Sequence, residues 1–352
     1  MKASCHRYIL QFKQASGTSR GILTEKETWF IILQDQERTG IGECGILRTL
    51  SYDDRPDYED KLSWVCEHIE LGEEKLYDEL EEFPSIRFGL EQAFLSLRSI
   101  DCFQLFPSEF TSGQSAIPIN GLIWMGKADF MERQIREKLN SGFDCIKLKI
   151  GAIDFETELH LISSIRKKFS PDDIEIRVDA NGAFGADVVM SRLEALSKYH
   201  LHSIEQPVKA GNPELMCKVC ANTPLPVALD EELIGVQTVT KRRDLLQMIK
   251  PQYIILKPSL VGGYRDSEEW IRLAEAVGAG WWITSALESN IGLNAIAQWT
   301  YTLNSDMPQG LGTGGLYTNN IEAPLVVQEG FLRINPGRNW NIDSVLKKIA
   351  KN

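Results

Sequence analysis

A strand–helix unit that repeats every 25 to 29 residues constrains the fold of this chain more than any other feature. Short apolar runs typical of buried strands begin near seven positions: Ile117, Ile146, Ile174, Leu201, Pro226, Tyr253 and Gly280. Stretches with helical spacing separate these runs, and a glycine-rich segment, 309–315, follows the last unit. Repeated β-loop-α units predict a parallel sheet covered by helices, here a modified (β/α)7β TIM-type barrel of the α/β class. Periodicity alone leaves a doubly wound open sheet as the alternative.

The first hundred residues do not share this period. Two expected strands and two expected helices occupy this region: residues 29–34, 40–46, 57–80 and 86–100. We therefore predict an N-terminal α+β capping domain over residues 1–112, which the C-terminal segment 325–352 joins. The catalytic (β/α) barrel domain is expected over residues 113–324.

Composition and charge argue against several classes of partner. The 352 residues include 38 Lys and Arg against 49 Asp and Glu, and the net charge of −11 argues against nucleic acid and anionic membranes. No apolar run approaches the length of a membrane span, and residues 1–6 do not open a signal peptide. Seven scattered cysteines indicate a reducing compartment, so we expect a cytoplasmic protein. The oligomeric state stays open, and a homo-oligomer is compatible with the sequence.

The strand that begins at residue 145 has an unusual polar pattern. Apolar residues alternate there with Lys147 and Lys149, so both lysines share one face. An edge strand with a solvated lysine face is one interpretation. A strand within a βαβ series is covered by helices on its outer face, however, so its apolar residues face outward and its lysines point into the barrel. A buried ammonium is unfavourable unless it is paired or functional.

Four successive strands end in an ionisable residue at a constant spacing. These residues are Asp179, Glu205, Asp230 and Lys257. A single acid at a strand end is more often a turn or cap residue, but the series lies at the carboxyl rim, where barrel active sites are built. Three carboxylates in one rim repel each other unless a cation binds, and oxygen ligands favour Mg²⁺ or Mn²⁺. We therefore predict that Asp179, Glu205 and Asp230 hold a divalent metal between lysines.

Such a site suits the removal of a proton next to a carboxylate. A bound cation stabilises the enediolate that forms when a carboxylate substrate loses its α-proton. The base must then be a neutral amine, so the pKa of Lys149 has to fall by ~3 units from about 10.4. We expect Lys147, the cation and burial to lower that pKa. The predicted ligand is a small-molecule carboxylate.

These motifs resemble the enolase superfamily. The matching runs are Lys147-Leu148-Lys149, Val178-Asp179-Ala180-Asn181-Gly182, Ile204-Glu205-Gln206-Pro207, Leu229-Asp230-Glu231 and Leu256-Lys257-Pro258. A Lys-x-Lys with an opposing lysine is similar to the muconate-lactonising subgroup, and the seventh strand lacks the histidine of the dyad-using subgroups. Residues 285–293 and 310–315 resemble runs of bacterial o-succinylbenzoate synthases. Residues 310–314 lack the Asp-x-Asp of dipeptide epimerases.

This resemblance implies a Mg²⁺-dependent hydro-lyase, with Mn²⁺ as an alternative metal. The implied reaction is the syn-dehydration of 2-succinyl-6-hydroxy-2,4-cyclohexadiene-1-carboxylate to o-succinylbenzoate in menaquinone biosynthesis. Lys149 is implied to remove the proton α to the ring carboxylate and then to protonate the departing hydroxide. Lys257 is implied to stay cationic and to support the enediolate.

Weaker candidates for substrate contacts lie at the rim loops. Ser285, Gly262 and Gly263 are expected to bind the succinyl carboxylate, although a helix cap and a tight turn explain them equally well. Asn181 is expected to orient a metal-bound water or to form an Asx turn. Residues 42–54 are expected to include a lid loop.

Two other activities and a non-catalytic role stay open. N-succinylamino acid racemisation, or another proton abstraction of the same subgroup, would use identical site residues. A Schiff-base aldolase would use Lys149 or Lys257 as its nucleophile. A non-catalytic barrel would keep its acids around a structural cation.

Overall fold

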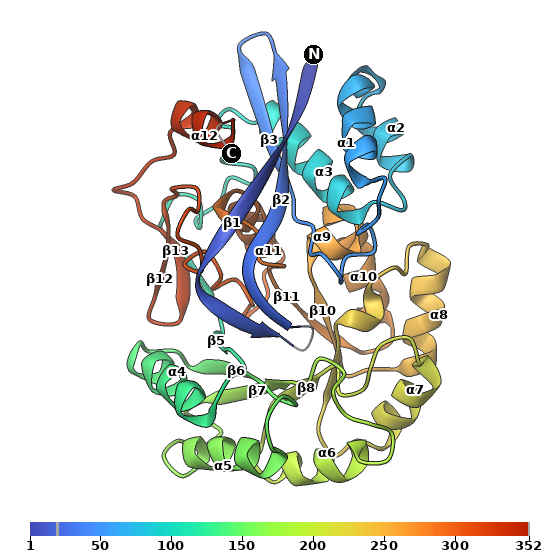
Figure 1. Ribbon diagram of the computed structural model, residues 1–352, viewed down its shortest axis with the longest axis vertical. Coiled ribbons are helices and arrows are strands. Elements are labelled where there is room, and N and C mark those ends of the chain that lie inside the picture. Colours follow the sequence, from blue (N-terminus) through green and yellow to red (C-terminus); the bar gives the residue numbers. More distant parts are fainter. Residues whose placement is uncertain (19–20, 351–352) are drawn as a thin grey trace.

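The computed structural model describes residues 1–18 and 21–350, so residues 351–352 of the expected C-terminal segment lie outside the described part. A three-stranded antiparallel sheet and its helices lie across a curled parallel sheet that helices surround (Figure 1). Within the described part, no helix combines the length and the apolar character that a membrane span requires.

The N-terminal sheet has the order β1-β2-β3 and packs on helix α3. The elements of this region are β1 (Lys2–Thr18), β2 (Gly21–Asp35), β3 (Arg38–Cys44), α1 (Tyr58–Glu67), η1 (Ile69–Leu71), α2 (Glu73–Asp78) and α3 (Pro84–Arg98). A Cβ at Gly42 would lie 1.8 Å from the carbonyl oxygen of Gly89, so only glycine allows β3 to pack this closely on α3. The predicted strand pair and the second predicted helix are confirmed. The first predicted helix is broken, because Gly72 has a φ of 80° before α2.

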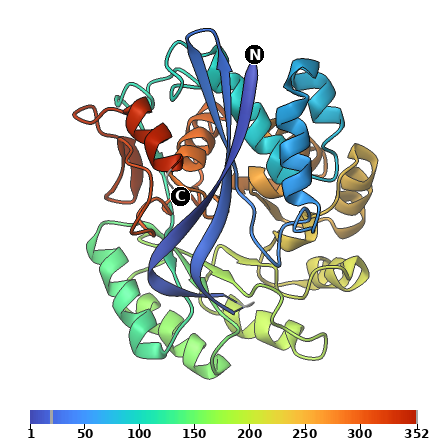
Figure 2. The ribbon, with the colours of Figure 1, turned by 45° about the horizontal axis from the view of Figure 1, so that its top comes forward.

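Alternation along β2 gives this sheet two apolar faces. Ile31 and Leu33 pack with the helices on one side, whereas Phe30 belongs to a cluster on the other side. Helix α12 (Ile342–Ile349), from the far end of the chain, covers that second side, and its Val345 packs in the same cluster as Phe30. Figures 1 and 2 show α12 beside the sheet.

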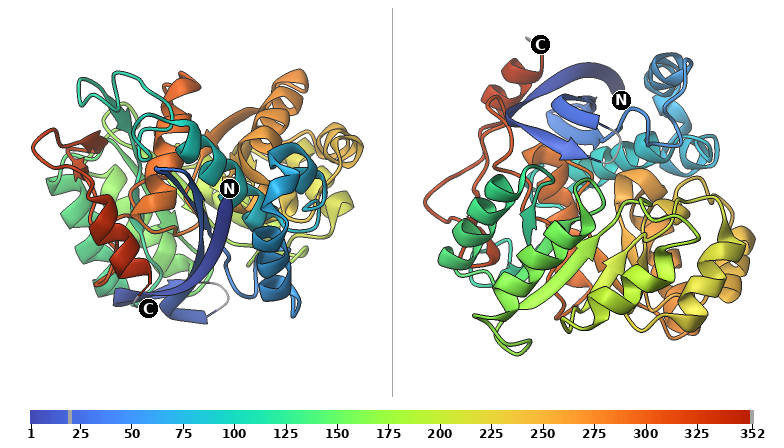
Figure 3. Two further views of the ribbon diagram at one scale, coloured as in Figure 1. Left: turned by 90° about the horizontal axis from the view of Figure 1, so that it is seen from above. Right: turned by 60° about the horizontal axis from the view of Figure 1, so that its bottom comes forward.

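The barrel contains a seven-stranded parallel sheet with the order β11-β10-β9-β8-β7-β6-β5. Its strands are β5 (Gly121–Ile123), β6 (Cys145–Lys149), β7 (Glu175–Asp179), β8 (Ser203–Glu205), β9 (Val227–Leu229), β10 (Tyr253–Leu256) and β11 (Gly280–Ile283). Its helices are α4 (Ala128–Asn140), α5 (Phe155–Arg166), α6 (Val189–Ser197), α7 (Pro213–Asn222), η2 (Glu231–Leu233), α8 (Val239–Ile249), α9 (Pro258–Val261), α10 (Gly263–Ala276) and α11 (Asn290–Thr302). Figure 3 shows these helices around the curled sheet.

The glycine-rich segment joins the two edges of this sheet. Gln309 forms a parallel bridge with Ile119, next to β5, and Gly310 forms one with Thr284, next to β11. Backbone hydrogen bonds of 2.8 Å accompany both bridges, from Gln309 N–H to Pro118 O and from Gly310 N–H to Ile283 O. The predicted barrel is therefore confirmed, and the open doubly wound sheet is not the fold.

The first strand of the barrel is not the one that the sequence indicates. The apolar residue Ile117 lies in β4 (Ala116–Pro118), which pairs with β13 (Phe331–Ile334) and not with the barrel sheet. β12 (Leu325–Gln328) completes this small antiparallel sheet. The barrel begins a few residues later, at β5, because the apolar run continues through Pro118 into a second short strand. β4 and the C-terminal segment thus share a sheet.

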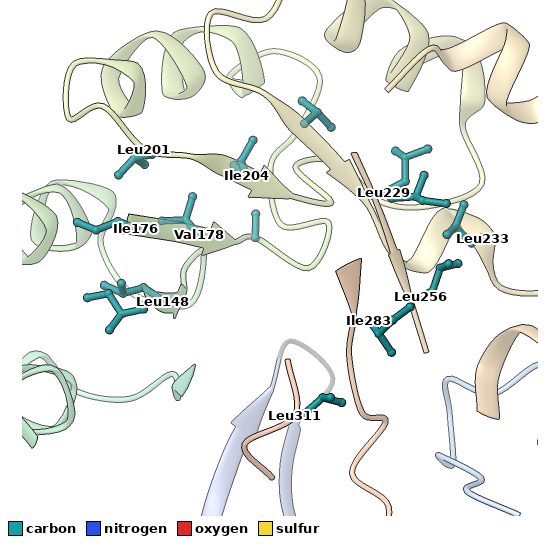
Figure 4. Packing of buried hydrophobic residues seen from close by; sticks show 14 of the residues in the cluster. Leu148, Ile176, Val178, Leu201, Ile204, Leu229, Leu233, Leu256, Ile283 and Leu311 are labelled. Carbon is teal, nitrogen blue, oxygen red and sulfur yellow. The ribbon is translucent and has the colours of Figure 1, made fainter. Parts of the chain in front are cut away.

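The outer face of the barrel sheet carries the hydrophobic core. Figure 4 shows Leu148, Ile176, Val178, Ile204, Leu229, Leu256 and Ile283 packed in this cluster. Strands covered by helices bury apolar residues on that face, so the alternate residues must point inward. The predicted parity of the strand with two lysines is therefore confirmed.

A buried acid anchors the connection between β3 and α1. Oδ2 of Asp53 accepts hydrogen bonds from the backbone N–H (2.8 Å) and the hydroxyl (2.6 Å) of Ser85, in the first turn of α3. Tyr58 Oη lies 2.7 Å from the same hydroxyl. Oδ1 of Asp53 has no hydrogen-bond partner among the described residues. Burial raises the pKa of Asp53 from 3.8 to about 6, because the charged form is poorly solvated.

This raised pKa predicts a pH dependence of stability. The folded protein keeps a proton on Asp53 that the unfolded chain loses, so the stabilisation is complete below pH 4 and is lost as the pH rises through about 6. Relative to Asp53→Asn, the wild type should lose ~3 kcal/mol of unfolding free energy across the whole window, of which ~2 kcal/mol falls between pH 4.5 and 7.5. Urea denaturation of both proteins at pH 4.5 and 7.5 measures the difference. An unchanged difference between the two pH values would contradict this assignment.

Candidate active site

A cavity of about 350 Å³ lies between the carboxyl rim of the barrel and the N-terminal domain. On the barrel side its lining includes Lys147, Lys149, Asp179, Asp230 and Lys257. The opposite side includes Ile22, Leu23, Leu47, Arg48, Thr49 and Leu50. One wall is therefore densely charged, whereas the other is largely apolar. The lining includes four residues of the expected lid loop, at 47–50.

Strand register brings the charged wall together. Lys149 lies beside Asp179 in the β6–β7 pair, and Asp179 lies beside Glu205 in the β7–β8 pair. Asp230 directly follows β9, and Lys257 directly follows β10. The three acids are only 1 %, 2 % and 3 % exposed in chain order. Parallel strands with equal parity therefore place three buried carboxylates at one level of the rim.

Each acid forms an ion pair with a lysine. Lys149 Nζ lies 2.9 Å from Asp179 Oδ2, and Lys147 Nζ lies 3.1 Å from the same oxygen. Lys147 also pairs with Glu205. Lys257 pairs with Asp230, and its Nζ lies 3.9 Å from Glu205 Oε1. The structure thus brings together all six residues that the sequence predicts for the metal site and for catalysis.

Glu205 is the member of this group with the strongest electrostatic conflict. Burial and repulsion by Asp179 raise the pKa of Glu205 well above its usual range. Burial alone would raise the pKa of Asp179, but attraction by Lys147 and Lys149 lowers it. Burial alone would lower the pKa of Lys147, but attraction by Asp179 and Glu205 raises it. At this depth in the barrel, the three carboxylates therefore need more neighbouring positive charge than the surrounding residues readily supply.

The three carboxylates suit a divalent cation chemically. Glu205 Oε1 is buried and accepts no hydrogen bond from the described residues, so a coordination position is open on it. Within residues 1–18 and 21–350 no three acids already form a metal-binding cluster. Lysine ammonium groups instead bridge neighbouring acids, Lys147 between Asp179 and Glu205 and Lys257 between Glu205 and Asp230. Oxygen-only donors favour a hard cation such as Mg²⁺.

Asn181 lies in the cavity and contacts Lys149. Its Oδ1 accepts a hydrogen bond of 2.7 Å from Lys149 Nζ, and its Nδ2 donates to Glu231 Oε1 at 3.0 Å. Its backbone N–H donates to Asp179 Oδ1 at 3.0 Å, so Asp179 rather than Asn181 forms the Asx turn. Glu231 also lines the cavity, which strand parity does not predict. β9 ends at Leu229, and η2 turns Glu231 toward the site.

The weaker substrate candidates separate into two groups. Ser285 lines the cavity, where its hydroxyl lies 2.7 Å from Thr313 Oγ1. Gly262 and Gly263 do not belong to the cavity lining, so the cavity does not support their expected contact with substrate, which stays a prediction. Their φ angles of 109° and 93° form the turn between α9 and α10. A Cβ at Gly263 would lie 2.1 Å from Glu91 Oε2, so this turn serves the packing on α3.

Arg48 and Trp124 also line the cavity. For Trp124 the sequence leaves a substrate contact and core packing equally open. Arg48 forms ion pairs with Glu27 (2.6 Å) and Asp54 (2.8 Å). It belongs to the expected lid loop, but the sequence does not single it out within that loop, because tertiary contacts of the N-terminal sheet set its position.

Comparisons with known families define the class. Residues 130–338 match the family described as enolase C-terminal domain-like, and residues 1–97 match the MenC N-terminal domain. The barrel, its covering α+β domain and the charged rim agree with these matches. The chain therefore belongs to the enolase superfamily.

Similar proteins indicate which group of this superfamily the chain belongs to. The o-succinylbenzoate synthase of Desulfotalea psychrophila is 46% identical, over 95% of this chain and 99% of that protein. The crystal structure of MenC from D. psychrophila LSv54 has a TM-score of 0.85 and 43% identity, with 95% of this chain and 99% of that chain covered. Within the superfamily, the chain belongs with the o-succinylbenzoate synthases.

A more distant structure shares the fold alone. The dipeptide epimerase from Enterococcus faecalis V583, complexed with Mg and the dipeptide L-Leu-L-Tyr, is 18% identical. Its TM-score is 0.80, and 95% of this chain and 96% of that chain are covered.

Proposed function

We propose that this chain catalyses the dehydration of 2-succinyl-6-hydroxy-2,4-cyclohexadiene-1-carboxylate to o-succinylbenzoate, a step of menaquinone biosynthesis. The observation that carries this conclusion is the likeness to the D. psychrophila synthase over nearly the full length of both proteins. A rim of buried acids and lysines in a cavity between the two domains supports it, because acid–base chemistry on a carboxylate needs both kinds of group. The protein is a hydro-lyase.

Mg²⁺ is the proposed cofactor, and Asp179, Glu205 and Asp230 are its proposed ligands. When bound, the cation supplies stabilisation of the negative charge that develops on the substrate carboxylate. The buried Glu205 Oε1, which has no hydrogen-bond partner among the described residues, supports this assignment. Lys147 and Lys257 must then move their ammonium groups away from the carboxylate oxygens that they now contact.

The three lysines have different roles, and Lys149 carries out both proton transfers. Lys149, as a neutral amine, takes the proton α to the ring carboxylate onto Nζ, and the resulting ammonium protonates the departing hydroxide. Both transfers occur on one face of the ring, which accounts for a syn elimination. Lys257 stays cationic on the opposite side and stabilises the enediolate. Lys147 adds positive charge beside Lys149, and Asn181 orients Nζ through its 2.7 Å hydrogen bond.

The proposed domain division follows the prediction from the sequence. Residues 1–112 and the C-terminal segment 325–352 form the capping domain, and residues 113–324 form the barrel. Contacts between α12 and β1 support the assignment of α12 to the capping domain, whereas β12 and β13 pair with β4, in the part assigned to the barrel. All seven cysteines are free, which supports a reducing, cytoplasmic location.

The decisive experiment offers the purified protein two substrates in the presence of Mg²⁺. We expect formation of the aromatic product, followed by ultraviolet absorbance, to proceed much faster than racemisation of an N-succinylamino acid, followed by optical rotation. Faster racemisation would identify the protein as a racemase instead. Borohydride reduction should trap no adduct on Lys149 or Lys257, because the proposed reaction involves no Schiff base.

A further inference from the structure

A carboxylate of the N-terminal domain reaches the N-terminus of barrel helix α11. Glu43, in β3, is completely buried. Its Oε1 accepts hydrogen bonds of 2.8 Å from the backbone N–H of Ser289 and from the hydroxyl of Thr28. Its Oε2 accepts hydrogen bonds from the Ser289 hydroxyl (2.6 Å) and from the backbone N–H of Gly292 (2.8 Å). Three of these four donors belong to the barrel, and a helix N-terminus favours negative charge.

Close approach of the two domains at this point requires glycine. A Cβ at Gly292 would lie 2.9 Å from Glu43 Oε2 and 2.8 Å from Glu288 Cβ. On the other domain, a Cβ at Gly45 would lie 3.0 Å from Glu288 Cγ. The run from Glu288 to Gly292, which the sequence marks without assigning it a role, therefore belongs to the interface between the domains.

Lys26 balances the charge of this interface. It is 4 % exposed, and its Nζ has no hydrogen-bond partner among the described residues. Burial lowers its pKa, and attraction by Glu43 and Glu288 opposes that effect. Glu288 Oε1 accepts a hydrogen bond of 2.6 Å from the Ser259 hydroxyl. The contact is thus a buried polar network, in which losing one partner leaves other groups unsatisfied.

The same network adjoins a wall of the cavity. Ser285, Ala286 and Leu287 line the cavity, and α11 begins directly beyond Ser289. Leu287 has a left-handed φ of 65°, and its carbonyl oxygen accepts a hydrogen bond of 2.7 Å from the Tyr317 hydroxyl. Only two residues lie between Ala286 and Ser289, the residue that Glu43 contacts. A shift of the α11 N-terminus would therefore move this wall.

We propose that Glu43 is a positioning residue, which holds the segment 285–289 at the place where it contacts the substrate. It connects the N-terminal domain to one wall of the cavity without itself touching the cavity. The proposal rests on the proposed dehydration, since the wall matters there for binding the substrate and not for proton transfer. Its predicted consequence is a change in KM that is larger than the change in kcat.

Glu43→Gln tests this proposal with almost no change in side-chain volume. A glutamine places an amide NH2 opposite a backbone N–H of Ser289 or of Gly292, whichever way it turns, so one contact becomes a donor facing a donor. We expect KM for dehydration to rise about tenfold and kcat to change less than threefold. Calorimetric affinity for o-succinylbenzoate should fall by the same factor as KM rises.

Thr28→Val is the matched control. It removes one hydrogen bond from the same carboxylate, but from the side of the N-terminal domain, and it leaves the three barrel contacts in place. We expect its KM to stay within twofold of the wild type. Ser289→Ala is a second variant in case Glu43→Gln does not fold, and it removes the hydroxyl contact to Oε2. Its KM should rise severalfold.

Hydrogen exchange gives a readout that does not depend on the reaction. In Glu43→Gln, the backbone amides of Ser289 and Gly292 should exchange faster than in the wild type. In Ser289→Ala, the amide of Gly292 should exchange faster. In Thr28→Val, both amides should exchange at the wild-type rate. A wild-type KM in Glu43→Gln and Ser289→Ala, or an equal rise of KM in Thr28→Val, would overturn the proposal. If the wild-type protein does not dehydrate the substrate, the proposed function is refuted. In that case the positioning role is still tested, because unchanged amide exchange in Glu43→Gln would overturn it independently.

Discussion

Lys149→Ala should lower kcat for dehydration by on the order of 10²–10⁴-fold, the range that a positioned acid–base group contributes. The same amine serves as base and then as acid, so its loss affects both proton transfers. Lys149 Nζ contacts Asp179 and Asn181, whereas the neighbouring Lys147 is held between Asp179 and Glu205. Stopped-flow or steady-state absorbance of the aromatic product measures the loss. Affinity for o-succinylbenzoate should change much less than kcat.

Lys149→Arg is the matched control for charge. An arginine keeps the positive charge but does not become a neutral base near pH 7, because its pKa exceeds 12. Its kcat should therefore be as low as that of Lys149→Ala. Turnover within tenfold of the wild type in either variant, with intact folding by circular dichroism, would refute the assignment of Lys149 as the base.

Removal of divalent metal is expected to have the second large effect. Dialysis against a chelator should reduce dehydration to the background, and added Mg²⁺ should restore it, because three buried carboxylates otherwise remain paired with lysines. Mg²⁺ should also stabilise the folded protein, by about 2.7 kcal/mol at a concentration one hundred times its dissociation constant. Thermal unfolding with and without Mg²⁺ measures that stabilisation independently of turnover.

Two variants test which acids respond to the metal. Asp179→Asn should lose both the activity and the Mg²⁺-dependent rise in Tm. Glu232→Gln is the control, because Glu232 is also a buried acid next to the site but is hydrogen-bonded to Gln206 and to the backbone N–H of Gly211. It should keep the Mg²⁺ response. A chelated protein with full activity, or equal Mg²⁺ responses in both variants, would contradict the proposed metal site.

The charged rim was predictable from the sequence because strand alternation is strict. Once Ile176 and Val178 are assigned to the outer face, Asp179 must face inward, and the register of the parallel strands places Glu205 beside it. The period of the strand–helix unit likewise predicts a parallel sheet covered by helices, although it leaves a barrel and an open sheet as alternatives. These inferences use only local pattern and the geometry of parallel sheets.

Features that depend on contacts between distant segments were not predictable. Ile117 has the apolar environment of a barrel strand, yet its partner is β13, more than two hundred residues away. Gly262 and Gly263 have the composition of an anion-binding turn, but the side chain of Asp266 lies next to Gly262 and that of Glu91, on α3, lies next to Gly263. Glu231 begins η2, just after strand β9 ends, so strand alternation no longer indicates which way its side chain points.

The cover on the outer side of the first sheet has a consequence for folding. Phe30 belongs to one hydrophobic cluster with Val345 and Ile349 of α12, more than three hundred residues further along the chain. Domains usually fold in the order in which they leave the ribosome. The first sheet departs from this order, because one of its apolar faces is covered only after α12 has been synthesised.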